Sequence, residues 1–523
     1  MAFLFSGLSI ISLICFSTFI YYVLNCNLTI KFLSFGGKVW LLNISFDSTT
    51  ISILLMLLIC FLYVLRYTHH YFGGEIAGFE LNKIICLFVR VMASLVCTGD
   101  YLTTLIFWEY LGVVSFFLIL FYDSYLSLRS SIITLVSSRF GDVCLFLLIM
   151  LGSLYINNVW FTLFIFFFII FTKSASFPFT RWLLEAMRAP TPVRSLVHSS
   201  TLVAAGVWFA MRYDFLLYFN KSFVFSILLL LTIFVTGICC FFFVDLKKIV
   251  ALSTCKKISW CVLYLIFGDC ILSLFQLIRH GVSKCMLFML VGDVMSGSGG
   301  SQARNCIYSP SLYSKWGIFS LFSVILGLSG APFIGVFFTK HFLLTKFLKI
   351  FSFTLFCVVL LCVFLSYFYS FRLCAIIIKL KSSIVRGVLF FFKTGLMVYF
   401  WLFVNYFISL ILDECKVLVF SVSWNLIGFQ LISCITSYYL YSRKLFRKWR
   451  SSLFGCDKLV ESFYSIYIQL YKFITIFFYR WDNYMMTLFS SRGVSIISTY
   501  TIKFLNILVM LILIFLMCYV IIY

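Results

Sequence analysis

Ionisable side chains lie inside several long apolar runs of this 523-residue chain. Glu109 stands in LIFWEYLGVVSFFLI, Lys173 ends FTLFIFFFIIFTK, and Lys284 follows His280 by about one helical turn in LIRHGVSKCMLFML. A charge near the centre of a bilayer costs about 2.5–3.5 kcal/mol on insertion scales, so a chain that keeps one there needs a reason. The chemistry that Glu, Lys and His share is the uptake and release of a proton. Their positions therefore indicate a proton relay through apolar surroundings.

Further ionisable groups lie in neighbouring runs. Arg139 and Asp142, three residues apart in TLVSSRFGDVCLFLL, share one helical face. His198 opens HSSTLVAAGVWF, while Lys340 and His341 are adjacent in GVFFTKHFLL. Any one of these could be a satisfied structural ion pair or a side chain that reaches the membrane surface. Because the groups are spread over successive runs, we favour a relay over a purely structural explanation.

Prolines mark two places where the helices that carry these groups must break. The chain has five, in two windows: Pro178, Pro190 and Pro192, then Pro310 and Pro332. Proline removes a backbone donor, and a broken helix inside a bilayer is tolerated where it lines a polar cavity. Pro178 follows Lys173, and Pro332 precedes Lys340. Two broken helices, each beside a buried lysine, predict the paired repeats found in transporters.

Composition places the whole chain in a membrane. Hydrophobic residues make up 63% of it, charged residues 11%, and the mean hydropathy is +1.11. An average soluble domain has about 25% charged residues, so a soluble enzyme, a secreted disulfide scaffold and a disordered chain are excluded. Since a span needs roughly 20 apolar residues, we predict an all-α polytopic membrane protein with about 15 transmembrane helices.

Apolar runs give the predicted spans. They lie at 3–24, 47–68, 81–99, 101–122, 128–152, 158–175, 193–213, 222–244, 248–267, 270–292, 313–347, 350–372, 387–412, 417–440 and 500–523. The run at 313–347 is too long for one straight span and reads as a single broken helix. Lys and Arg are denser in the loops after even-numbered spans, which predicts that those loops and the N-terminus face the inside.

Residues 453–490 follow a different pattern. Polar residues recur every three to five positions along an otherwise apolar rod. Such a helix lies along a membrane surface or on partner helices. We therefore predict a long lateral amphipathic helix, followed by a terminal anchoring helix at 500–523.

Several kinds of redox or nucleotide site are excluded. The 20 cysteines include no C-x-x-C spacing, so neither a metal site nor an iron–sulfur cluster is predicted. Five histidines are too few for a haem–copper oxidase core subunit. The Gly-rich stretch 297–300 has no following Lys-Ser/Thr and is no P-loop.

Six motifs in sequence order carry a resemblance. They are FWEYLGVVSF, SRFGDVCLF, KSASFPFTRWLLEAMRAPTPVRSLVHSSTLVAAG, DLKKIVALSTCKKIS, HGVSKCMLFM and LSGAPFIGVFFTKHFLL. Together they resemble the subunit 5 family of mitochondrial NADH:ubiquinone oxidoreductase (respiratory complex I). That family is similar to the large subunit of Mrp-type cation/proton antiporters. The resemblance covers roughly residues 90–350.

The resemblance implies a role for each candidate residue. Glu109 and Lys173 look like the acid–lysine pair of a first half-channel, tuned by Arg139 and Asp142. His198 and Lys284 look like a central axis, with His280 as a neighbouring histidine. Lys340 looks like the lysine of the second broken helix, which exchanges protons with the outer side, and His341 stands beside it.

Three positions depart from the family. Thr180 and Gln276 each stand where the family has a histidine, and His341 stands where it usually has an Asp. A cation beside Lys340 would repel it, so we expect a carboxylate or a water chain within reach of Lys340. The alternative is that His341 points at lipid headgroups and takes no part in proton transfer.

The resemblance also implies an organisation and a function. It predicts N-terminal helices over 1–100, half-channels over 101–244 and 245–372, further helices over 373–442, a basic loop and lateral helix over 443–499, and an anchor over 500–523. The implied function is proton translocation in the mitochondrial inner membrane, driven by quinone reduction in other subunits. NAD, FMN, iron–sulfur clusters and ubiquinone would be bound by those subunits, with no cofactor or metal in this chain. Expected partners are adjacent antiporter-like subunits and phospholipids, with no nucleic acid.

Two alternatives remain. The chain could be a stand-alone or Mrp-type cation/proton antiporter subunit, although such a protein has no obvious use for a lateral helix at 453–490. It could instead be a purely structural assembly subunit. In that case neutralising the buried charges would leave proton pumping intact.

Overall fold

Helices dominate the parts of the chain that the structure, a computed structural model, describes. These parts are residues 26–35, 38–153, 159–213, 223–243, 245–267, 269–296, 308–310, 315–332, 334–350, 353–378, 381–383, 401–402, 405–406, 419–440, 458–489 and 507–518. The chain forms two units, Met1–Cys456 and Asp457–Tyr523, and each is described by itself.

An antiparallel hairpin precedes the described helices of the first unit. Strand β1 (Cys26–Phe35) pairs with β2 (Lys38–Phe46), with Thr29 opposite Asn43. The Asn43 side chain donates a 2.9 Å hydrogen bond to Asp100, which ties the hairpin to the start of the third described helix. The hydropathy pattern did not predict this hairpin.

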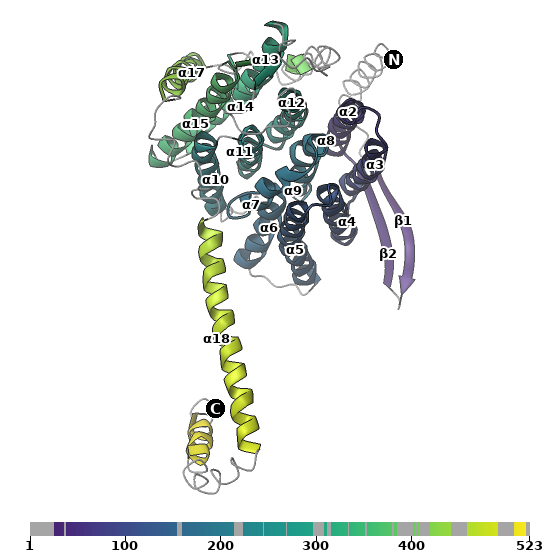
Figure 1. Cartoon of the computed structure of the whole chain (residues 1–523), viewed down its shortest axis with the longest axis vertical. Coiled ribbons are helices and arrows are strands. Elements are labelled where there is room, and N and C mark those ends of the chain that lie inside the picture. Colours follow the sequence, from purple (N-terminus) through teal and green to yellow (C-terminus); the bar gives the residue numbers. More distant parts are fainter. Residues whose placement is uncertain are drawn as a thin grey trace. The chain divides into compact units, whose positions relative to one another are not determined.

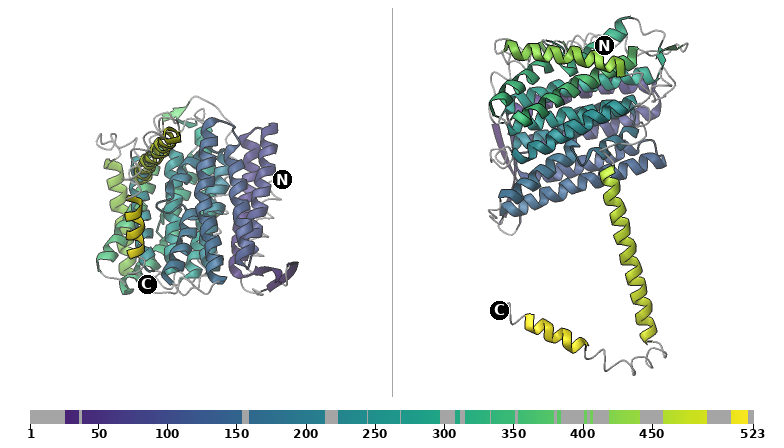
Figure 2. Two further views of the ribbon diagram at one scale, coloured as in Figure 1. Left: turned by 90° about the horizontal axis from the view of Figure 1, so that it is seen from below. Right: turned by 90° about the vertical axis from the view of Figure 1, so that its left-hand side faces the viewer.

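The first half of the bundle contains the helices α2 to α10. Their bounds are α2 Ser48–Tyr71, α3 Ile76–Cys97, α4 Tyr101–Leu120, α5 Tyr125–Ser153, α6 Val159–Ser174, α7 Thr180–Glu185, η1 Ala186–Arg188, α8 Thr191–Leu196, η2 Val197–Thr201, α9 Leu202–Arg212 and α10 Phe223–Phe242. Figure 2 shows the longer of these helices running side by side.

The second half continues with α11 to α17. Their bounds are α11 Leu246–Ile266, α12 Cys270–Ser296, α13 Lys315–Ser329, α14 Val336–Ile350, α15 Phe353–Ile378 and α17 Phe420–Leu440. Two short parallel strands, β3 (Tyr308–Pro310) and β4 (Lys381–Ser383), pair with each other. Packing of α11 against both α10 and α12 places it inside the bundle (Figure 1).

Six helices of the described residues are long and apolar enough to cross a membrane. They are Ser48–Tyr71, Tyr101–Leu120, Tyr125–Leu151, Leu246–Ile266, Cys270–Ser296 and Leu355–Ile378. Three shorter apolar helices occur at Trp160–Ser174, Val224–Cys240 and Ile507–Cys518. The expectation of a helical, multi-pass membrane chain is confirmed. The predicted span at 3–24 and most of that at 387–412 lie outside the described residues, so the count of about 15 stays a prediction.

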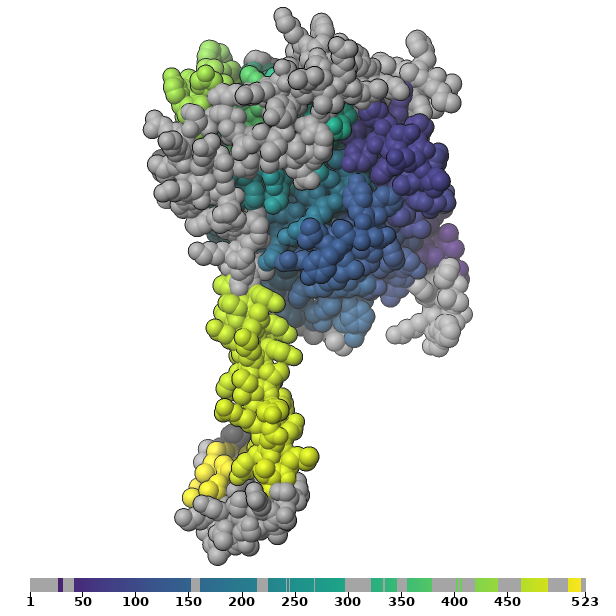
Figure 3. Space-filling view, viewed as in Figure 1, coloured from purple at the N-terminus to yellow at the C-terminus, as the bar shows by residue number. Residues whose placement is uncertain are grey.

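Burial separates inner helices from outer ones. In the most apolar stretch of α12 all residues are buried, and in that of α11 94% are. The corresponding share in α5 is 28%. Large side chains such as Phe140, Val143 and Phe146 of α5 are exposed, as suits a helix that faces lipid. The blue side chains of this region form part of the outer surface in Figure 3. The ionisable groups of α11 and α12 are thus held away from lipid.

Both predicted helix breaks are confirmed. Helix α6 ends at Ser174, and the next helix, α7, begins only at Thr180. The run at 313–347 divides into α13 and α14, joined through Gly330 and Gly335, which have φ of +91° and +51°. These are left-handed conformations that glycine adopts without the penalty of a Cβ atom. Each break leaves helix-terminal carbonyls without a partner in their own helix.

A third irregularity was not predicted. The run at 193–213 is helical, but a π-helical turn, η2, separates α8 from α9. Such turns are frequent at functional sites. His198 lies in this turn.

The second unit contains α18 (Lys458–Phe489) and a helix at Ile507–Cys518. With 32 residues, α18 is about 48 Å long. Its large side chains, Tyr467, Phe473 and Trp481 among them, are exposed within this chain. Within the predicted range 453–490 the described residues 458–489 form one helix, while its lateral placement stays a prediction.

Candidate proton-transfer site

Lys173 lies in the last turn of α6, immediately before the first break. Its side chain is 1% exposed. The ammonium donates a hydrogen bond of 3.4 Å to the Trp108 carbonyl and stands 5.1 Å from the centre of the Trp108 ring. Gly112, one turn further along α4, lies next to the ammonium, since a Cβ atom on it would lie 4.0 Å from the Lys173 Nζ. Dipole and ring contacts therefore replace part of the hydration that this ammonium loses.

Arg139 of α5 joins the two carboxylates of this region. Its Nη1 lies 3.5 Å from Glu109 Oε1 and 3.4 Å from Asp142 Oδ2. This confirms that Arg139 and Asp142 share a helical face. The Glu109 side chain is 49% exposed, whereas that of Asp142 is 5% exposed. Among the described residues, no carboxylate oxygen lies within ion-pair distance of Lys173, although both acids interact with it electrostatically.

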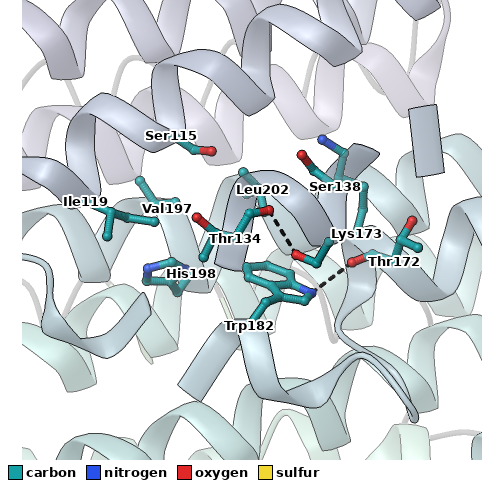
Figure 4. Close-up of a pocket in the computed structure, with 11 residues that line it drawn as sticks. Ser115, Ile119, Thr134, Ser138, Thr172, Lys173, Trp182, Val197, His198 and Leu202 are labelled. Carbon is teal, nitrogen blue, oxygen red and sulfur yellow. Dashed lines mark hydrogen bonds between the residues drawn. The ribbon is translucent and has the colours of Figure 1, made fainter. Parts of the chain in front are cut away.

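A small cavity with both apolar and hydroxyl side chains in its lining lies between Lys173 and His198 (Figure 4). Its volume is about 10 Å³, close to what one water molecule needs. Hydroxyl groups line it, from Ser115, Thr134, Ser137, Ser138 and Thr172. Trp182 of α7 closes one side and donates a 2.9 Å hydrogen bond to the Thr172 carbonyl. The break after α6 thereby shapes the cavity, since it lets α7 turn back against that helix.

His198 stands on the far side of this cavity. Its side chain is 0% exposed, and the Ala186 backbone lies close enough to interact with its ring. The cavity thus has Lys173 and His198 on opposite sides of a space about the size of one water molecule.

Lys284 occupies the middle of α12 in the second half. Its ammonium donates to the Ser253 hydroxyl and, over 3.2 Å, to the Val250 carbonyl, both in α11. His280 lies one turn earlier, is fully buried, and has no hydrogen-bond partner at either ring nitrogen among the described residues. The predicted pairing of a lysine with a neighbouring buried histidine is present on one helix face.

Lys340 shows how a broken helix holds a buried ammonium. Its Nζ donates to the Ser329 carbonyl at 2.5 Å and to the Ser366 hydroxyl at 2.6 Å. Ser329 is the last residue of α13, so its carbonyl is one that the break leaves free. The ammonium also lies 3.5 Å from the centre of the Tyr367 ring. The second break therefore supplies the acceptor that replaces water around Lys340.

His341 has a different environment from Lys340. Its Nε2 lies 3.0 Å from the Val419 amide nitrogen and 3.1 Å from the Val419 carbonyl oxygen, at the start of α17. An unprotonated Nε2 accepts the amide hydrogen and thus links α14 to α17. The partners of Lys340 within the described chain are a carbonyl, a hydroxyl and a ring, so the carboxylate expected near it is not among them. His341 is 0% exposed, so it does not point at lipid headgroups, and its part in proton transfer stays a prediction.

Residues 98–367 match the family described as "NADH:quinone oxidoreductase/Mrp antiporter, TM". The chain belongs to this family. The matched range begins before Glu109 and ends beyond Lys340, so it contains every candidate residue named above.

Curated relatives of this NADH:quinone oxidoreductase/Mrp antiporter chain are named NADH-ubiquinone oxidoreductase chain 5. The one from Ascaris suum is 32% identical over 384 residues, which is 70% of this chain and 68% of the relative. That from Caenorhabditis elegans is 34% identical over 347 residues, 63% and 64% of the two chains. The match to the Artemia franciscana protein covers 53% of that protein's length. The aligned part of this chain thus spans between about half and two thirds of these relatives.

Solved structures show the same fold at low identity. The Mrp complex from Dietzia sp. DQ12-45-1b matches with a TM-score of 0.69 and 19% identity, covering 97% of this chain and 59% of the other. An archaeal membrane-bound sulfane sulfur reductase matches with a TM-score of 0.64 and 16% identity, covering 84% and 92%. Both are membrane complexes that share the fold of this chain.

Sequence reasoning missed several buried charges of this antiporter-family chain. Lys256 and Lys257 of α11 are 0% and 1% exposed, and Arg279 and Asp293 of α12 are also buried. The two lysines lie in DLKKIVALSTCKKIS, which served only as a motif of the resemblance. Their position within the apolar run 248–267 was the signal that could have identified them.

Proposed function

We propose that this chain is a proton-translocating membrane-arm subunit of an NADH:ubiquinone oxidoreductase. Two features support the proposal: the chain 5 relatives, and lysines at two helix breaks with buried histidines between them. The second feature carries the mechanism, because each lysine lies beside a break and donates to a backbone carbonyl, that of Trp108 in α4 for Lys173 and that of Ser329 at the second break for Lys340. The organisation into about 15 spans, with α18 lateral and facing adjacent subunits on the matrix side, belongs to the same proposal.

Proton transfer would begin with Lys173. When its ammonium gives a proton to the cavity water, that water passes another to His198, and each N–H or O–H bond broken is matched by one formed. The Arg139 guanidinium beside Glu109 and Asp142 keeps these acids available as charge partners. A change in their charge alters how strongly Lys173 holds its proton.

The chemistry that drives these transfers would lie in other subunits. NAD, FMN, iron–sulfur clusters and ubiquinone would be bound there, with phospholipid around this chain. Quinone reduction would change charges at one end of the membrane arm, and successive buried groups would respond.

The second candidate function is a cation/proton antiporter subunit outside a respiratory complex. The likeness to the Mrp complex favours it at the level of fold. Purification of the chain from native membranes separates the two. Co-migration with NADH-oxidising activity supports the first function, whereas a chain that migrates apart from it and exchanges Na⁺ for protons without NADH would contradict it.

A further inference from the structure

The proposed proton path of the second half-channel has a gap between Lys284 and Lys340. Lys284 contacts α11 through Ser253, while Lys340 contacts the end of α13 and α15. Between them on α12 lies His280, and then Gln276, whose Oε1 accepts a 3.0 Å hydrogen bond from the Thr339 hydroxyl of α14. An amide cannot take up and release a proton as an imidazole can. The path therefore lacks a carrier where α12 meets α14.

Helix α11 runs across the same gap. Ser253 meets Lys284 at one level, and the Tyr264 hydroxyl donates a 3.3 Å hydrogen bond to the Thr339 carbonyl at the other. Residues 253, 257 and 264 are spaced by four and seven positions, so they lie within about 40° of one another on one helix face. Lys257 lies about 6 Å along the axis from the level of Ser253. Lys257 therefore lies between the level of Ser253, which binds Lys284, and the level of Tyr264, which binds the residue before Lys340.

The electrostatic surroundings of Lys257 agree with this placement. It interacts with Lys284 and with its neighbour Lys256, and its charge also acts on His280 and Lys340. The remaining group that acts on it is Cys261. None of these neighbours is a carboxylate, so the cluster cannot hold all its protons at once without strong repulsion between like charges.

We propose that Lys257 is a further proton-carrying residue, and that it takes the step between Lys284 and Lys340 that Gln276 cannot perform. This inference rests on the proposed proton translocation. In the step, an N–H bond of the Lys284 ammonium breaks and one forms at the neutral Lys257 amine, directly or through His280. Lys257 then passes a proton towards Lys340, and one positive charge moves along the face without net change.

Lys256 provides a matched control. It is the same residue type, equally buried and adjacent, but it lies about 100° away around the helix. Its ammonium stands 5.4 Å from the centre of the Tyr369 ring of α15 and against Gly237 of α10. Its charge, like that of Lys257, acts on Lys340, but its contacts are with α10 and α15, so we expect its removal to leave the path intact.

The test measures NADH-driven proton uptake per NADH oxidised in proteoliposomes of the assembled complex. We expect Lys257→Gln to lower the rate of coupled pumping about tenfold or more, as loss of a positioned proton carrier does. Lys257→Arg keeps the charge and the hydrogen-bond donors but releases no proton, so it should be equally impaired. Lys256→Gln should pump as the unsubstituted complex does.

A second substitution tests rescue. Gln276→His places a protonatable ring at the other side of the gap, so the double variant Lys257→Gln/Gln276→His should recover most of the lost rate. Normal pumping by Lys257→Arg would show that only charge matters there and would overturn the inference. If Lys257→Gln fails to assemble, the Arg variant alone decides.

The proposed function and this inference fail in different ways. If the unsubstituted complex moves no protons with NADH, the proposed function is wrong. If it does so, and Lys284→Met is impaired while both Lys257 variants are normal, only the inference is wrong.

Discussion

At the residue scale, the buried amines are positioned by dipoles more than by ion pairs. Lys173, Lys284 and Lys340 each donate to a backbone carbonyl, and two of them also stand over aromatic rings. A buried carboxylate in direct contact would hold a lysine in its charged form. Neutral partners stabilise the ammonium less, so they suit a group that must release its proton as well as bind it.

Lys173→Met should lower coupled pumping about tenfold or more without preventing assembly, because an apolar side chain is cheaper to bury than an ammonium. Glu109→Gln should have a smaller effect, since Arg139 still pairs with Asp142. Pumping rates and native gels of both variants provide the measurement. If the complex fails to assemble, instead of assembling and pumping slowly, the result would argue against a relay role.

His341→Leu should behave in the opposite way. It removes the hydrogen bond between the imidazole and the Val419 amide, so we expect about 0.5–1.5 kcal/mol of destabilisation. Pumping per assembled complex should not change. Thermal unfolding and NADH-driven proton uptake measure the two effects. A loss of pumping at normal stability would return His341 to the proton path.

At the element scale, the breaks after α6 and between α13 and α14 were predictable, because proline and glycine change the backbone locally. The hairpin at 26–46 was not predicted, although two short runs rich in β-branched and aromatic residues separated by Gly36-Gly37 are typical of one. The turn η2 left no local signal. Lys257 lies within the apolar run 248–267, so its burial could have been predicted, whereas its level between Lys284 and Lys340 depends on how α11 packs against α12 and α14.

Gly330→Ala tests the second break. Gly330 has φ +91°, and a Cβ atom there would lie 3.1 Å from the Phe337 amide nitrogen. We expect roughly 1–3 kcal/mol of strain and a displaced Ser329 carbonyl, hence lower stability and slower pumping. Gly428→Ala in α17 is the control, because its Cβ atom would meet nothing within 4 Å. Equal stability of the two variants would contradict the role of the break.

At the scale of the whole molecule, α18 exposes large aromatic side chains that proton transfer alone would not require. A surface of this kind indicates contact with other membrane subunits or lipid. Its pattern was predictable from the sequence as an amphipathic rod, whereas what covers it depends on molecules outside this chain.

Deleting residues 500–523 should therefore impair assembly more than proton chemistry. The deletion removes the apolar helix at Ile507–Cys518, which we predict to anchor the far end of α18. The yield of complex on native gels and the pumping rate per assembled complex separate the two effects. Truncated complexes at normal yield would show that the anchor is dispensable.

Lys284→Arg gives the most direct test of proton movement through the buried lysines and histidines. Arginine keeps the charge and can still donate to Ser253 and Val250, but it does not release its proton at physiological pH. The measurement is the number of protons translocated per NADH oxidised by the assembled complex in sealed proteoliposomes. If protons pass through Lys284, the variant assembles normally and this ratio, or the coupled rate, falls sharply. An unchanged ratio at an unchanged rate would contradict the relay.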